Sequence, residues 1–96
     1  MAFYFLCKDK AGAAEVRMQN REAHLAYLGQ HKEQLVAAGP LQDEAGEGMI
    51  GSLLILNFND RAEADAFAAG DPYAKAGLFE SVEIGRWKQV VPPVDG

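Results

Sequence analysis

His24 is the residue whose chemistry best suits proton transfer, because an unperturbed imidazole changes its charge between about pH 5 and 8. It lies in a helical pattern, one turn from Asn20 and Leu28 and close to Arg17 and Arg21. The arginines and His24 would give that helix a cationic edge. A half-buried histidine without a chemical role fits the same position, and the residues alone do not separate the two interpretations.

Asp71 is the carboxylate that could serve such an imidazole. It stands in the segment Gly70-Asp71-Pro72-Tyr73, and Asp before Pro is a common helix cap that needs no other purpose. The amide groups bound by a cap carboxylate also keep it ionised. Asp71 is therefore predicted to cap a helical turn, and it is a suitable anionic partner for a histidine.

Other polar residues give weaker signals. His31 lies on nearly the same side of the helix as His24, but no third ligand has a metal-binding spacing, so we expect no metal. Cys7 is expected to pack inside a strand, and the acidic turn at 43–47 lacks the spacing of a calcium-binding EF-hand loop. Glycines in 46–51 lack the lysine of a phosphate loop. No flavin or nicotinamide motif is visible, so we expect no cofactor.

The elements that must position these residues follow from the hydrophobic period and from Gly and Pro breaks. We expect a strand at 2–8, a helix at 13–38, a short strand at 41–43, a strand at 49–58, a helix at 62–69 capped by Asp60 and Glu63, a helical turn from Asp71 to Gly77, and a strand at 79–89. This β-α-β-β-α-β order predicts an α+β, ferredoxin-like fold, with an antiparallel sheet and both helices on one face.

The first helix is expected from an apolar stripe, which consists of Met18, Leu25, Leu28, Leu35 and Val36. Its end is expected at Gly39-Pro40, since Pro cannot continue a helix.

Both faces of the predicted sheet are apolar. In the first strand Phe3, Phe5 and Cys7 oppose Tyr4 and Leu6, and in the third Ser52, Leu54 and Leu56 oppose Leu53 and Ile55. Helices can cover only one face, and a large exposed apolar face usually marks an interface. We therefore expect a homodimer. The alternative is a monomer whose tail, residues 90–96, folds over the sheet.

Composition limits the class of protein. The 96 residues predict one domain, 1–96, with an extended Pro-containing tail at 90–96. The net charge is −5 without a basic run, so we expect neither nucleic acid nor membrane as a partner. The apolar start is too short for an export signal, and the single cysteine fits a reducing compartment, so a cytoplasmic protein is expected.

Five segments together resemble the YCII-related (YciI-like) domain family: Arg21-Glu22-Ala23-His24-Leu25, Ala38-Gly39-Pro40-Leu41, Gly51-Ser52-Leu53, Asp71-Pro72-Tyr73 and Ala76-Gly77-Leu78-Phe79. The resemblance covers nearly the whole chain. It implies a dimeric α+β barrel, in which two ferredoxin-like units face their sheets to each other. It also implies a catalytic pair of His24 and Asp71, a substrate-binding role for Ser52 and, with weaker support, one for Arg21.

These roles suit metal-free proton transfer on an unknown small molecule. Asp71 would fix the tautomer of His24, whose other ring nitrogen would take a proton. The expected reaction is isomerisation or a dehydrochlorinase-type elimination on a small cyclic or aromatic compound. Two alternatives stay open: a non-catalytic metabolite-binding or accessory subunit, and a cofactor-independent oxygenase that resembles antibiotic monooxygenases in fold alone.

Overall fold

The structure is a computed structural model that describes residues 1–93. Its elements are β1 (Ala2–Asp9), α1 (Ala14–Gln30), β2 (Leu35–Gln42), β3 (Met49–Asn57), α2 (Arg61–Gly70), α3 (Pro72–Lys75) and β4 (Phe79–Trp87). The strands form one antiparallel sheet in the order β2-β3-β1-β4. The predicted ferredoxin-like α+β fold is therefore confirmed.

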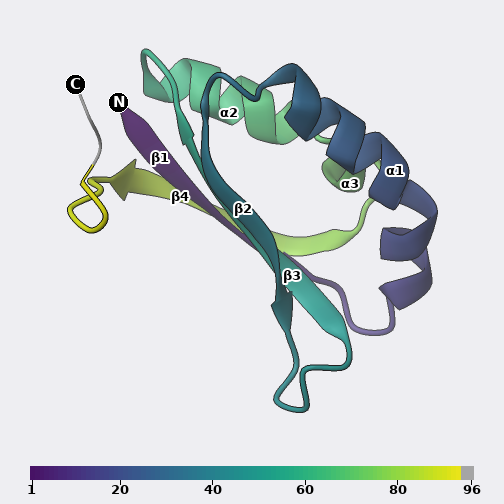
Figure 1. Cartoon of the computed structure of the whole chain (residues 1–96). Coiled ribbons are helices and arrows are strands. Elements are labelled where there is room, and N and C mark those ends of the chain that lie inside the picture. Colours follow the sequence, from purple (N-terminus) through teal and green to yellow (C-terminus); the bar gives the residue numbers. More distant parts are fainter. Residues whose placement is uncertain (94–96) are drawn as a thin grey trace.

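The core lies between the sheet and the helices, which cover one of its faces (Figure 1). Phe3, Phe5 and Cys7 alternate along β1 and are all buried, because side chains in a strand point to opposite faces in turn. Phe67 of α2 packs its ring edge-on against Phe5. The predicted division of strand residues between the two faces is thus the observed one.

The predicted helix at 13–38 is wrong at its end. Helix α1 ends at Gln30, residues 31–34 form a turn, and β2 begins at Leu35. Leu35 and Val36 therefore belong to a strand, although their spacing fits the helical stripe. Pairing with β3 overrides helical propensity here. Pro40 is tolerated because β2 is an edge strand, where the missing N–H interrupts no inner ladder.

Both predicted caps are present. The backbone N–H of Glu63 donates to Asp60 Oδ1 at 2.9 Å, and the Glu63 carboxylate accepts from the N–H of Asn59. Asp71 caps α3 in the same way, since its Oδ1 accepts from the N–H of Tyr73 at 2.9 Å. Gly77 ends that segment with φ +74°, a conformation that suits glycine.

The segment after β4 differs from the expected extended tail. Residues 90–93 form a turn, and the remainder of the 90–96 tail lies outside the described residues. Val90 and Val91 are exposed, so these two side chains do not cover the outer sheet face. Within residues 1–93, the structure contains no helix that is long and apolar enough to span a membrane.

Gly51 supplies a stability prediction, because a Cβ there would lie 2.4 Å from the backbone oxygen of Cys7. We expect Gly51→Ala to lower the free energy of unfolding by about 1–3 kcal/mol, the usual cost of overpacking. Gly39→Ala is the matched control, since Gly39 is also a strand glycine and its Cβ would meet nothing within 4 Å. Urea unfolding at one protein concentration compares them, and equal midpoints would contradict the prediction.

Candidate functional site

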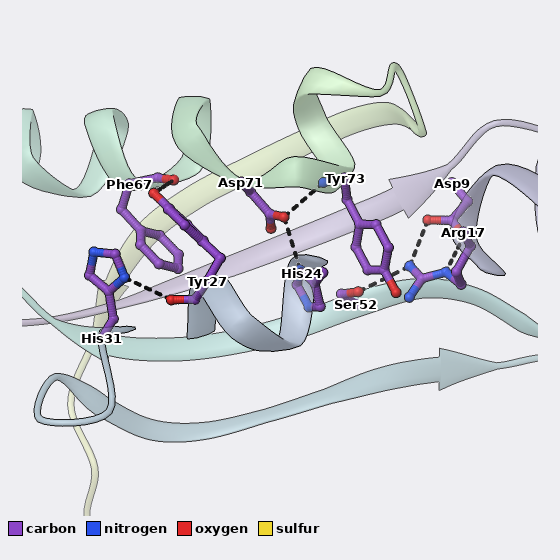
Figure 2. A network of polar contacts seen from close by, with 9 residues as sticks. All are labelled: Asp9, Arg17, His24, Tyr27, His31, Ser52, Phe67, Asp71 and Tyr73. Atoms are coloured by element: carbon purple, nitrogen blue, oxygen red, sulfur yellow. Dashed lines mark hydrogen bonds and ion pairs between the residues drawn. The ribbon is translucent and has the colours of Figure 1, made fainter. Parts of the chain in front are cut away.

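His24 and Asp71 meet under the helices. His24 points inward from α1 and is 6% exposed, and Asp71 is 3% exposed at the junction of α2 and α3. His24 Nδ1 lies 2.9 Å from Asp71 Oδ1 (Figure 2). The structure thus brings together the two residues that the sequence pointed to. His24 is buried rather than set on an exposed cationic edge.

The shared oxygen decides which nitrogen of His24 is available. Asp71 Oδ1 also accepts the N–H of Tyr73, and a carboxylate held by such donors only accepts. His24 must therefore carry its hydrogen on Nδ1. The other ring nitrogen, Nε2, keeps a lone pair and can take a proton.

Tyr73 holds the imidazole from the side. Its ring stacks on His24 with centroids 4.0 Å apart and planes at 15°. The guanidinium carbon of Arg17 lies 4.6 Å from the centroid of the same ring. Tyr73 therefore lies between the histidine and a buried cation, as Figure 2 shows.

Arg17 is buried, in contrast to the cationic edge expected of it. Its Nε and Nη2 donate to the two carboxylate oxygens of Asp9, at 2.7 and 2.8 Å. Nη2 also donates to Ser52 Oγ at 3.0 Å. No local pattern predicts this contact, because Asp9 follows the predicted strand at 2–8 and is flanked by Lys8 and Lys10, either of which could balance its charge.

A cavity of about 400 Å³ opens beside these side chains, between α1 and the strands β2 and β3. Its polar lining includes His24, Arg17, Arg21, Ser52 and Tyr73. This volume lies toward the lower end of the range for small-molecule sites. Three of the four predicted site residues, Arg21, His24 and Ser52, therefore line one space, and Asp71 contacts His24 from behind it.

The mouth of the cavity carries three apolar side chains together with the charged Arg21 and Glu47. Met18 and Leu25 of α1 and Met49 of β3 line it and are exposed. The sequence predicted Met18 and Leu25 as part of a core-facing stripe, and that prediction is wrong for these two. Arg21 is exposed at the same opening, and it makes no hydrogen bond or ion pair with other side chains in residues 1–93.

The remaining candidates lie away from this space. Burial, together with the negative charge of nearby Asp71, raises the pKa of the Cys7 thiol to about 12, so the thiol stays protonated. His31 packs against Phe67, and its Nδ1 lies 3.1 Å from the backbone oxygen of Tyr27. Within residues 1–93, no group of at least three His, Cys, Asp or Glu side chains is placed to hold a metal ion.

Comparison with known proteins gives concordant matches. The model of the YCII-related domain family matches residues 1–88. Protein YciI of Escherichia coli is 37% identical over 97 residues, which covers 94% of this chain and 99% of that protein. The 5-chloro-2-hydroxyhydroquinone dehydrochlorinase TftG of Burkholderia phenoliruptrix, in complex with 2,5-dihydroxybenzoquinone, is 35% identical with a TM-score of 0.89, and covers 96% of this chain and 98% of that one.

A more distant structure shares the architecture. An antibiotic biosynthesis monooxygenase has a TM-score of 0.54 at 13% identity, and covers 93% of this chain and 97% of its own. At this identity the likeness shows the fold alone, and an oxygenase activity gains no support from it.

Proposed function

The chain belongs to the YCII-related domain family, and from that premise we propose that it is a lyase that removes hydrogen chloride, or a comparable acid, from a small hydroxylated ring. The observation that carries this proposal is the contact of His24 Nδ1 with Asp71 beside a cavity. The likeness to a dehydrochlorinase at 35% identity over nearly the full chain supports the reaction class.

The proposed role of His24 is to move protons, with Asp71 as its orienting partner. For a chlorinated trihydroxybenzene, one hydroxyl proton moves to the carbon that carries chlorine. His24 Nε2 then takes a proton from a second hydroxyl, whose electrons form a carbonyl. The ring electrons shift, and chloride leaves with the carbon–chlorine pair. The sum is loss of one HCl, without oxidant or reductant, and general base catalysis of this kind contributes about 10²- to 10⁴-fold in rate.

The cavity supports a ring as the substrate. Apolar side chains at the mouth, Met18, Leu25 and Met49, suit the faces of an aromatic compound. Arg21 stands at the same opening and is proposed to balance negative charge on the ring oxygens. Ser52 is proposed to bind a substrate oxygen.

Chloride release tests this proposal. The purified protein is incubated without air with 5-chloro-2-hydroxyhydroquinone, the compound named for the similar dehydrochlorinase, and chloride is measured by ion chromatography. We expect one chloride per substrate consumed, together with a quinone absorbance. Binding of this compound without chloride release would contradict the proposal and favour a metabolite-binding protein.

We also propose that the protein is a homodimer, in which the sheets of two copies face each other. Leu6 and Leu53 pair across β1 and β3 on the face that the helices leave open, and Leu53 is exposed. The resemblance to the YCII-related domain family, which implies a dimeric α+β barrel, supports this arrangement. Residues 90 and 91 do not cover that face.

The dimer predicts a specific effect of charge on the outer face. Leu53→Arg should yield a monomer of about 10.4 kDa by light scattering, where the unmodified protein gives twice that mass. Val82→Arg is the matched control: Val82 and Leu53 are both 39% exposed, but Val82 pairs with Cys7 and so lies on the helix side. Equal masses for the two variants would contradict the proposed interface.

Charge and the single thiol support the rest of the proposal. The net charge is −5, which disfavours phosphate-rich partners such as nucleic acid or anionic membrane. Cys7 is a buried free thiol, and such thiols are common where disulfides do not form. We therefore propose a cytoplasmic protein whose partners are its own second copy and a small molecule.

A further inference from the structure

The Asp9–Arg17 pair has no part in the proton transfer proposed above, yet it borders the cavity. The Arg17 and Asp9 side chains are 9% and 6% exposed, and Arg17 binds both oxygens of the carboxylate. A buried ion pair adds little stability compared with apolar side chains of similar volume. The contact from this pair to Ser52 therefore indicates a second role.

The contact with Arg17 fixes what the Ser52 hydroxyl can do. A guanidinium only donates hydrogen bonds, so Ser52 Oγ is the acceptor at 3.0 Å. The hydroxyl hydrogen is left for another partner, and Ser52 donates to no acceptor within residues 1–93. Because Ser52 lines the cavity, that hydrogen is available to a bound molecule.

Two more donors reach the same space. Every fully buried side-chain nitrogen or oxygen in residues 1–93 has a hydrogen-bond partner. Arg17 and Tyr73 both line the cavity, and a hydrogen bond between their side chains contributes to the pKa of each group. Because a guanidinium only donates, the Tyr73 hydroxyl accepts from Arg17 and its own hydrogen is left for another partner. Burial raises the pKa of Tyr73, although Arg17 opposes the shift, so the hydroxyl keeps its proton at neutral pH.

We infer that Arg17, Ser52 and Tyr73 form a donor corner that binds a negatively charged oxygen of the substrate ring, and that Asp9 and Arg17 act as the positioning residues of Ser52. That the bound molecule is a reacting ring rests on the proposed function. A donor corner favours rings that carry an ionised oxygen, or an oxygen that becomes ionised as His24 takes a proton. Tyr73 lies between the donor corner and the base, so a ring beside it would meet both.

Binding of two ring compounds tests the donor corner without any turnover. One probe is 2,5-dihydroxybenzoquinone, which is a dianion at neutral pH, and the other is hydroquinone, whose phenols stay neutral at pH 7. Titration calorimetry gives the selectivity ratio, which is the dissociation constant of hydroquinone divided by that of the dianion. We expect Ser52→Ala and Tyr73→Phe each to weaken dianion binding about 10- to 100-fold, since hydrogen bonds to charged groups are the strong ones.

The selectivity ratio separates a donor role from general damage to the cavity. Hydroquinone accepts weaker, neutral hydrogen bonds, so its affinity should fall less and the ratio should drop about tenfold. Ser81→Ala is the matched control, because Ser81 is an exposed serine of β4 outside the cavity. An unchanged ratio in both Ser52→Ala and Tyr73→Phe would overturn the donor corner.

The positioning role of Asp9 is tested through Ser52. Asp9→Asn frees the guanidinium while it keeps the shape of the side chain, and it should lower the selectivity ratio. If Asp9 acts through Ser52, the double variant Asp9→Asn with Ser52→Ala should have nearly the same selectivity ratio as Ser52→Ala alone. If the effects of the two single changes on the selectivity ratio instead multiply in the double variant, Asp9 does not act through Ser52 and this role is overturned. If Asp9→Asn fails to fold, Arg17→Lys replaces it, since lysine keeps the charge and loses the two-pronged contact.

Failure of this inference is distinguishable from failure of the proposed function. Selective binding of the dianion through Ser52 and Tyr73, without chloride release from the chlorinated substrate, would support the donor corner and refute the lyase. Chloride release with an unchanged ratio in the variants would support the lyase and refute the donor corner.

Discussion

Turnover of 5-chloro-2-hydroxyhydroquinone should fall about 10²- to 10⁴-fold when His24 is replaced by asparagine, the usual contribution of a general base. Asparagine can still donate to Asp71, so the buried carboxylate keeps a partner and the fold should survive. The loss should appear in kcat, while the affinity for 2,5-dihydroxybenzoquinone changes little. Initial rates of chloride release, with calorimetry beside them, provide both values.

Asp71→Asn should lower the same rate, because an amide does not hold Nδ1–H as a carboxylate does. Asparagine caps helices about as well as aspartate, so stability should change little. Asp60→Asn is the matched control: Asp60 caps α2 with the same 2.9 Å contact and lies outside the cavity. The double change at His24 and Asp71 should lower the rate of chloride release little more than the more damaging single change does. If the falls in rate of the two single variants simply multiply in the double variant, Asp71 acts only as a helix cap.

The largest loss of stability should come from removing Asp9. Asp9→Ala leaves the Arg17 guanidinium buried without its carboxylate, and breaking a buried pair in this way costs about 3–5 kcal/mol. Asp65→Ala removes an ion pair of similar length, 2.8 Å, from the surface of α2. The side chains of that pair are 58% and 56% exposed, and such pairs contribute about 0.2–1 kcal/mol.

Urea unfolding of the two alanine variants measures this difference. Arg17→Met with Asp9→Leu removes both charges, and it should recover much of the stability that Asp9→Ala alone loses. A cost for Asp9→Ala as small as that for Asp65→Ala would contradict the stabilising role that the burial of this ion pair predicts for Asp9.

The fold was predictable wherever local signals agreed with tertiary contacts. The cap at Asp60, the positive φ at Gly77 and the alternation of Phe3 and Phe5 each follow from side-chain chemistry within a few residues. The end of α1 was not predictable in this way. Leu35 and Val36 fit a helical stripe and a strand equally well, and only the partner strand β3 decides between them.

The site was predictable for the residues that a family pattern contains, and less so for those that support them. His24, Asp71, Ser52 and Arg21 stand in recognisable segments, whereas Arg17 stands in none of them. Arg17 is buried and Arg21 is exposed because the end of β1 brings Asp9 under the first arginine. That contact joins a strand to a helix, so no local pattern reports it.

Helix α1 carries both Arg17 and His24 into the cavity, and this limits how the length of the chain can change. Successive helical residues turn by about 100°, so Arg17 and His24 fall within roughly 20° of each other. One inserted residue between them would turn His24 away by about 100° and uncouple the base from the donor corner. The hairpin loop between Gln42 and Met49 has no such limit, because exposed loops absorb insertions at little cost. Natural or engineered variation in length should therefore accumulate in that loop and be absent from residues 17–24.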